Sequence, residues 1–272
     1  MNRVILPDVE LCAIVRDELI NPAGGIEDFV RSTAPFVGRM TIVDTGSKDG
    51  TREKLRGLQK GYPSLNIAEY DSSMRDAYLF VDPRVMMAGI LKPEEMLADT
   101  PNRFSYAAAR NYAVSLTQSK WLLVLDADER LTPDDFGRIA RLRRQHPHAR
   151  GFNFDFRNIY LGGKDEVIKA ESRSALNPRL YAKNPDIVFI DGWPQRGETL
   201  RDISSENMFK AGLKIEKVCI NVGVEIKHFK STKQAQEQFS TEWRASKLGK
   251  SPADLPSFSQ VRRVNPKRKE YS

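Results

Sequence analysis

The sequence predicts an α/β protein whose N-terminal half is built on a mainly parallel sheet flanked by helices. Short apolar runs at 11–17, 40–44 and 65–70 have the length and composition of buried strands. Between them, apolar residues recur at helical spacing over 26–34, and a polar helix is expected over 52–60. Strands that alternate with helices form parallel sheets, so a ligand site is expected beyond the carboxyl ends of these strands.

The segments that follow continue this pattern and then change it. An alanine-rich helix is expected at 104–118, and the most apolar strand of the chain, at 121–129, runs into three acidic residues. Thr132, followed by Pro133 and two acids, predicts the start of an arginine-rich helix. From Gly151 onward aromatic and polar residues alternate, which is typical of half-exposed strands. The C-terminal half is therefore expected to be mixed or antiparallel.

The composition is that of an ordinary globular protein with a basic surplus. Lys and Arg number 43 and Asp and Glu 36 among the 272 residues, which gives a formal net charge of +7. This surplus permits an acidic partner, nucleic acid included, without selecting one. No apolar run reaches 18 residues and the N-terminus does not resemble a signal peptide, so we expect no transmembrane segment and a cytoplasmic location.

Two carboxylates, Asp126 and Asp128, follow the most apolar strand. In an extended chain, positions i and i+2 point the same way, so both side chains are expected on one side. Such oxygen donors suit Mg²⁺ or Mn²⁺, and a metal there can offset charge on a departing nucleoside diphosphate. The alternative is a solvated acidic turn before a helix.

A third acid, Asp44, ends the strand at 40–44 and precedes Thr-Gly-Ser-Lys-Asp-Gly-Thr. A carboxylate at a strand end can accept a hydrogen bond from a nucleoside base or a ribose hydroxyl. The residues after it are good turn formers in any protein. Asp49 and Thr51 are expected to cap the next helix rather than to bind a ligand.

Together these blocks resemble family 2 glycosyltransferases with the GT-A fold, whose sheet is Rossmann-like. The similar segments are LCAIVRDE, TIVDTGSKDGT and FSYAAARNYAVSLTQSKWLLVLDADERLTPDD, in the family's order and spacing. They cover residues 10–137, with a weaker similarity to residue 229. The resemblance implies a hexosyl- or pentosyltransferase that uses a nucleotide sugar, expected to be a UDP-sugar, and a divalent metal, Mn²⁺ or Mg²⁺. The acceptor it implies is a saccharide, a protein, a lipid or a modified DNA base.

The resemblance also implies a donor site. Asp44 would bind the nucleoside, Asp126 would lie near the ribose, and the A-R-N helix would contact the donor. Glu18 matches an acid after the first strand, where the family has N-E and this chain has D-E, and a capping or surface role is the alternative. For the arginine of the helix the alternative is a surface position. The implied donor-binding residues are Asp44, Arg110, Asn111, Asp126 and Glu18.

In the second half, residues 177–200 resemble the family's P-R-L-F segment and the G-x-x-H-E element after it. An inverting transfer needs a carboxylate that takes the proton of the acceptor. Glu198 is the first candidate for this catalytic base and Asp191 the second. Gly197 stands where the family has histidine, and a surface loop acid is the alternative for Glu198.

A late histidine, His228, ends the segment VEIKHF. By the same resemblance it would be a third metal ligand beside Asp128 and Asp126, although a strand-end histidine without this role is an alternative.

The predicted organisation is one domain with two halves and a tail. Residues 1–150 form the donor-binding half, residues 151–250 the acceptor-binding and catalytic half, and residues 251–272 a basic, loosely ordered tail. Two other functions remain open. A nucleotidyltransferase or sugar-nucleotide pyrophosphorylase also uses an acid pair, but the first strand-to-helix turn lacks a Gly-rich phosphate loop. A nucleic-acid-binding module with a degenerate GT-A fold would not need the acids.

Overall fold

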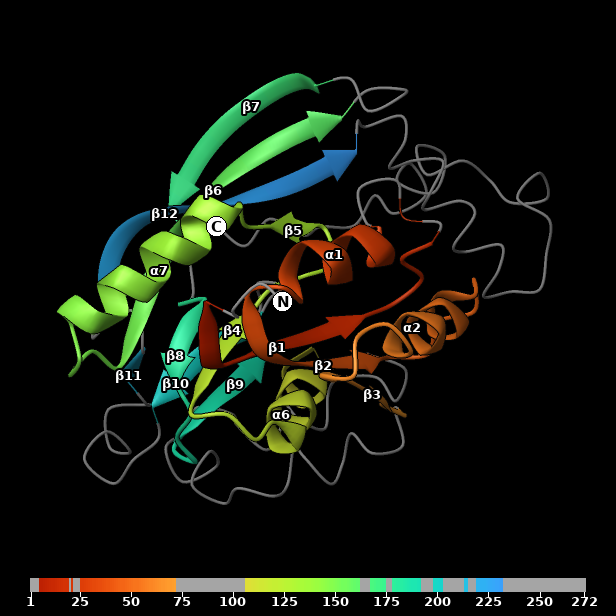
Figure 1. Cartoon of the computed structure of the whole chain (residues 1–272), viewed down its shortest axis with the longest axis horizontal. Helices are drawn as coiled ribbons and strands as arrows, with labels where there is room; N and C mark the ends of the chain where they lie inside the picture. Colours follow the sequence, from red (N-terminus) through yellow and green to blue (C-terminus); the bar gives the residue numbers. More distant parts are fainter. Residues whose placement is uncertain are drawn as a thin grey trace, which may run out of the picture.

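The computed structural model describes residues 5–19, 21, 25–71, 106–161, 167–174, 178–191, 198–202, 213–214 and 219–231. Within these ranges the strands form a nine-stranded sheet and a three-stranded sheet, with helices packed against them (Figure 1). The tail predicted at 251–272 lies outside the described residues.

The N-terminal half of the larger sheet is parallel, as predicted. Its strands lie in the order β3-β2-β1-β4, and each neighbouring pair runs in parallel. The central strand β1 is buried from Val9 to Val15 because both faces of the sheet are covered. The strands are β1 (Leu6–Val15), β2 (Val37–Asp44), β3 (Leu65–Glu69) and β4 (Trp121–Val124).

Alternating residues of β1 feed two apolar cores, one on each face of the sheet. Leu11 and Ala13 pack with the apolar residues of α1, α2 and α7, whereas Cys12 and Ile14 pack with the alanines of α6. Figure 1 shows α6 on the opposite side of these strands from α1. The helices are α1 (Ile26–Thr33), α2 (Thr51–Gln59), α6 (Tyr106–Leu116) and α7 (Pro133–Gln145).

The second half of the larger sheet is mixed, which confirms the predicted change of texture after Gly151. β8 runs antiparallel to β4 and to β6, β6 runs parallel to β12, and β5 and β7 join at the outside in antiparallel pairs. These strands are β5 (Glu129–Arg130), β6 (Gly151–Leu161), β7 (Val167–Ser174), β8 (Leu180–Ala182) and β12 (Ile220–Ser231).

The smaller sheet is antiparallel and packs beside α6. It has the order β11-β10-β9 among the described residues. Its strands are β9 (Ile187–Asp191), β10 (Glu198–Asp202) and β11 (Leu213–Lys214).

The strand expected over 121–129 is shorter than predicted. It ends at Val124, and the acidic residues after it form a turn closed by a hydrogen bond from the Glu129 N–H to the Asp126 carbonyl, 2.9 Å. The prediction that an extended chain directs Asp126 and Asp128 to one side is therefore wrong, because the chain is not extended there. The start of α7 is as predicted: Thr132 is the N-cap and forms a capping box with Asp135.

No helix in the described part of the chain has the length and apolarity that crossing a membrane requires.

Candidate functional site

Three neighbouring parallel strands end at one edge of the sheet. β1 lies between β2 and β4, so the residues that follow all three strands share this edge. Adjacent strands are about 4.8 Å apart, so β2 and β4 lie about 10 Å apart on either side of β1. The predicted donor acids Glu18, Asp44 and Asp126 therefore come together from three parts of the sequence.

Asp44 is the last residue of β2, and its side chain is fully buried. One carboxylate oxygen, Oδ1, accepts from the N–H groups of Gly46 and Ser47, both at 2.9 Å, and from the Arg52 guanidinium at 3.0 Å. The other oxygen, Oδ2, is buried without a hydrogen-bond partner among the described residues. Burial raises the pKa of Asp44, but these hydrogen bonds outweigh it and hold the pKa below its usual value. Asp44 is thus ionised, with one oxygen left to accept a donor.

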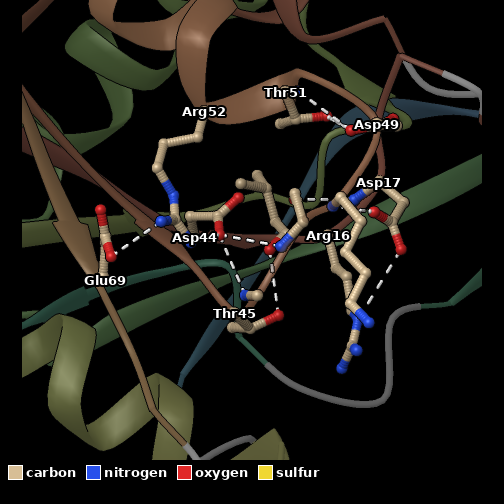
Figure 2. A network of polar contacts seen from close by, with 12 residues as sticks. Arg16, Asp17, Asp44, Thr45, Asp49, Thr51, Arg52 and Glu69 are labelled. Carbon is tan, nitrogen blue, oxygen red and sulfur yellow. Dashed lines mark hydrogen bonds and ion pairs between the residues drawn. The ribbon is translucent and has the colours of Figure 1, made fainter. Parts of the chain in front are cut away.

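Arg52 holds Asp44 from the first turn of α2. Its other terminal nitrogen lies 2.9 Å from the Glu69 carboxylate at the end of β3, and Arg56 reaches the same carboxylate at 3.0 Å. Figure 2 shows Arg52 between Asp44 and Glu69. The guanidinium is fixed from two sides, so Asp44 has little freedom to turn.

The loop after β2 also holds the loop after β1 (Figure 2). The N–H of Asp17 donates to Ser47 Oγ at 2.9 Å, and the N–H of Lys48 donates to Asp17 Oδ1 at 2.7 Å. Asp17 has φ 54°, a left-handed conformation that costs energy in a non-glycine residue. These reciprocal bonds stabilise the strained residue immediately before Glu18.

Asp49 and Thr51 add further hydrogen bonds between the same two loops. The N–H of Glu18 donates to Thr51 Oγ1 at 2.8 Å, and the N–H of Leu19 donates to Asp49 Oδ2 at 2.8 Å. The helix itself begins after Gly50, with φ 95°, and no side chain caps it there. Asp49 does accept the N–H of Thr51, 2.9 Å, at the first helical residue. The expectation of capping was therefore incomplete, because both side chains also fix the Glu18 loop.

Glu18 faces the acids that follow β4. Burial is the main cause that raises the pKa of Glu18 to about 8, and the negative charges of Asp128 and Asp126 add to it. The Asn21 amide donates to the carboxylate of Glu18 at 3.1 Å. Three carboxyl groups within electrostatic reach of one another make this edge attractive to a cation.

Asp126 is held by two arginines from different elements. Arg110 of α6 forms an ion pair with its Oδ1, and Arg179, just before β8, lies 3.9 Å from its Oδ2. The side chain of Arg110 is only 4% exposed, whereas that of Asp126 is 39% exposed. The alternative that Arg110 is a surface arginine is therefore wrong. Its buried charge is directed at an acid that faces solvent.

The acid next in the sequence, Glu129, has a structural function. Its side chain is buried, accepts the N–H of Asp126 at 2.9 Å, and receives a 2.7 Å hydrogen bond from Arg179. Burial raises the pKa of Glu129, and the charge of Arg179 opposes this. Glu129 and Arg179 bond each other, and both contact Asp126, so together they stabilise the acidic turn. Sequence reasoning missed this pair, although the P-R-L segment that contains Arg179 was visible.

Arg130 ties the acidic turn to the start of α1. Its guanidinium donates to the carbonyl oxygens of Ala127, at 2.6 Å, and Gly25, at 3.0 Å, and lies over the Phe29 ring. The turn is thereby held from the α1 side as well.

Asn111, the neighbour of Arg110, reaches away from these acids. Its amide nitrogen donates to the Phe189 carbonyl at 2.9 Å, and its amide oxygen accepts the Phe189 N–H at 2.8 Å. The structure thus joins α6 to β9 through this side chain.

The acceptor-half candidates are described in their backbone only. Asp191 ends β9 and Glu198 begins β10, and the two are paired across the antiparallel strands. His228, in β12, is paired with Glu129 of β5. Their side chains lie outside the described part of the structure. The fold thus brings the two candidate bases side by side and places His228 beside the acidic turn.

The described residues contain no group of three or more His, Cys, Asp or Glu side chains that could hold a metal by themselves. Asp126 is already paired with arginine. Asp128 lies on the same turn, and its charge acts on Glu18, Glu129 and Arg130. Mg²⁺ commonly takes one or two carboxylates together with substrate phosphates. The donor set therefore fits a divalent cation that arrives with a diphosphate.

Residues 97–193 match the sequence model of the family described as Glycosyl transferase family 2. This match confirms the predicted resemblance and the predicted enzyme class, a glycosyltransferase. The matched segment contains Arg110, Asn111, Asp126, Asp128 and Asp191 from the predicted site. Glu18, Asp44, Glu198 and His228 lie outside it. No curated protein matches the chain significantly.

Solved structures give distant similarities. S. aureus TarS matches with a TM-score of 0.46 and 12% identity, over 92% of this chain and 40% of that one. Its 1–349 fragment matches with a TM-score of 0.43 and 12% identity, over 92% and 67%. Glucosyl-3-phosphoglycerate synthase from Mycobacterium tuberculosis, in complex with Mn²⁺, UDP and glucosyl-3-phosphoglycerate, matches with a TM-score of 0.43 and 14% identity, over 91% and 80%.

Proposed function

We propose that this chain transfers a sugar from a UDP-sugar to an acceptor, with inversion at the sugar carbon and with a divalent cation, Mn²⁺ or Mg²⁺, at the diphosphate. The observation that carries the proposal is the edge where β2 and β4 end. It presents a buried, singly unsatisfied carboxylate at Asp44 and an arginine-braced acidic turn at Asp126–Asp128. The family match over the second of these elements supports the proposal independently.

Asp44 selects the kind of base. Its Oδ1 already accepts three hydrogen bonds, so a base that reaches the buried Oδ2 would meet an atom that can only accept. Uracil offers a ring N–H at N3, and guanine offers one at N1. Cytosine and adenine present acceptors at the equivalent ring positions. A hydrogen bond to an ionised, buried carboxylate contributes about 1.5–3 kcal/mol, which is enough to separate these two groups of bases.

The arginine pair prepares the acidic turn for the diphosphate. Arg110 and Arg179 offset the charge of Asp126, so it does not repel the phosphates as a bare carboxylate would. Asp128 then remains as the acid that would hold the cation, and a bound cation would also favour the ionised form of Glu18, whose pKa is otherwise raised to about 8. When bound there, such a cation supplies charge neutralisation at the departing diphosphate. We propose that His228 completes the set, since its backbone lies beside Glu129.

The acceptor side needs a base. In the proposed inverting reaction, the acceptor oxygen or nitrogen forms a bond to the anomeric carbon as the bond to the diphosphate oxygen breaks. A carboxylate takes the acceptor proton. Glu198 and Asp191 are our candidates, and their pairing across β9 and β10 supports one shared location. Sugar transfer then proceeds between this strand pair and the acidic turn.

A thermal-shift panel tests the proposal. A ligand that binds only the folded chain raises its melting temperature by mass action, by about 2.7 kcal/mol of stability at a hundredfold excess over Kd. UDP-sugars, GDP-sugars, CDP-sugars and ADP-sugars would each be measured with and without Mn²⁺. The expected result is stabilisation by UDP-sugars that increases with Mn²⁺. Stabilisation by none of them, or equally by all, would contradict the proposal.

A further inference from the structure

Asn111 makes a two-point connection between a helix and a strand. Its amide group both donates to and accepts from the backbone of Phe189, at 2.9 Å and 2.8 Å. Two residues that face each other in an antiparallel hydrogen-bonded pair exchange bonds in the same way. The side chain therefore replaces one rung of a β-ladder and fixes β9 against sliding along α6.

The strand that Asn111 holds carries the acceptor side of the site. Phe189 lies two positions before Asp191, the end of β9, and Asp191 is paired with Glu198. α6 also packs against β9 and β10 beyond this one contact. The position of both candidate bases thus depends on where α6 holds the strand.

Arg110, the residue before Asn111 in α6, contacts the proposed donor side of the site. Arg110 pairs with Asp126, whereas Asn111 bonds Phe189. Successive helical residues are rotated by about 100°, so adjacent side chains reach different elements. Two consecutive residues on one rigid helix thereby link the acidic turn to β9. The distance between these two parts of the site is set by the backbone of α6.

We propose that Asn111 is a positioning residue and not a donor ligand: it places β9, and with it Asp191 and Glu198, relative to Asp126. This inference rests on the proposed function, because it takes one of the two acids as the base. It replaces the direct donor contact predicted for Asn111 from the sequence. A misplacement of about 1 Å in a reacting group costs about a hundredfold in rate, so such a residue affects turnover more than binding.

The test compares Asn111→Asp with Ser115→Ala. Aspartate keeps the size and the acceptor oxygen but sets an oxygen against the Phe189 carbonyl. Ser115 is an exposed residue of the same helix whose hydroxyl donates to the Tyr112 carbonyl at 2.7 Å and so does not reach β9. If Asn111→Asp fails to fold, Asn111→Gln, which has both groups on a longer arm, takes its place with a smaller expected loss.

Three readouts are measured on the full chain. Amide hydrogen exchange over 187–191, without ligand, reports on β9. Titration with UDP and Mn²⁺ reports on the donor site, and UDP release from UDP-glucose and UDP-N-acetylglucosamine in water reports on turnover. For Asn111→Asp we expect faster exchange in β9, a Kd for UDP within about twofold of wild type, and turnover lowered about tenfold to a hundredfold. Ser115→Ala should change none of them.

A rise in the Kd for UDP that matches the loss of turnover would make Asn111 a donor ligand and overturn the inference. Wild-type turnover in Asn111→Asp, or unchanged exchange over 187–191, would overturn it as well. A wild-type chain that neither binds UDP nor releases it from either sugar would instead refute the proposed function, and the inference would fall with it.

Discussion

The two acids at the ends of β2 and β4 share an edge of the sheet but are built differently. Asp44 is fully buried, and the hydrogen bonds to one of its oxygens come mainly from backbone N–H groups and one arginine. Asp126 is 39% exposed and is held by arginines from two distant parts of the chain. The first environment fixes a single acceptor atom, and the second offsets charge. A group that can recognise a hydrogen-bond donor and a group whose charge is compensated therefore follow two strands that lie on either side of β1.

This difference shows which kind of ligand each end can take. A buried acceptor discriminates by hydrogen bonding, because an unmatched group there stays unpaired. An exposed, charge-compensated turn suits an ion or a phosphate, whose interactions are less directional. A nucleoside diphosphate has both features at its two ends.

Asp128→Asn should cause the greatest loss. It removes the acid that we assign to the cation, and metal stabilisation of a leaving diphosphate amounts to several kcal/mol, so UDP release should slow about a thousandfold. The measurement is turnover of a stabilising UDP-sugar across a Mn²⁺ titration. Asp134→Asn, in the first turn of α7, is the control and should retain activity. Full activity in Asp128→Asn would show that no catalytic cation binds at this turn.

Arg179→Met tests the contribution of the Arg179–Glu129 pair to the stability of the acidic turn. It leaves the buried carboxylate of Glu129 without its 2.7 Å partner, and breaking a buried pair from one side costs about 3–5 kcal/mol. Urea unfolding measures the change. The double variant with Glu129→Gln should lose less than the sum of the two single changes.

A matched control for the Arg179–Glu129 pair is Arg56→Met. Arg56 and Glu69 form an ion pair at 3.0 Å with both side chains at least half exposed. Removal of this surface pair should change stability by about 0–1 kcal/mol. Equal losses in the two arginine variants would show that burial of the Glu129 pair is unimportant.

Asp44→Asn should invert the choice of base. If the amide oxygen keeps the position of Oδ1, the amide nitrogen takes the position of Oδ2 and donates where the carboxylate accepted. The Kd for UDP should rise about tenfold to a hundredfold, and CDP should lose less or gain. Calorimetric titration with both nucleotides measures this. A parallel loss for UDP and CDP would mean that Asp44 supports the fold without reading the base.

Glu18 gives the most gradual effect, because it is spread over several pH units. Its pKa is raised to about 8 in the folded chain, above the ordinary value of 4.5, so the folded state binds more protons between these values. Stability should therefore fall as the pH rises from about 4.5 to about 8, by at most about 1.4 kcal/mol per pH unit from this group. Glu18→Gln should flatten this slope, whereas Glu53→Gln on the exposed side of α2 should not. Identical slopes in all three proteins would exclude a raised pKa at Glu18.

The sequence predicted the positions of the acids but not their partners. The apolar runs that end at Asp44 and before Asp126 are local patterns, and the parallel order of the strands follows from their alternation with helices. The pairing of Arg179 with Glu129 depends on how β8 meets β4 in the antiparallel half, across 50 positions. The contact between Asn111 and Phe189 spans 78 positions. No local sequence pattern predicts contacts between residues that are so far apart in the chain.

The turn itself marks the same limit. The sequence 121–129 is continuously apolar up to its acids, so an extended strand through Asp128 was the natural prediction. The strand ends at Val124 because the side chain of Glu129 is buried and its carboxylate accepts the N–H of Asp126. Long-range burial of one carboxylate decided the local conformation.

The most direct test of the division between the two acids is a crystal structure of the chain soaked with Mn²⁺ and UDP. Our account predicts the uracil N3–H at Asp44 Oδ2 and the metal bound jointly by the diphosphate and Asp128. A nucleotide bound away from the ends of β2 and β4, or a metal that leaves Asp128 uncoordinated, would contradict it.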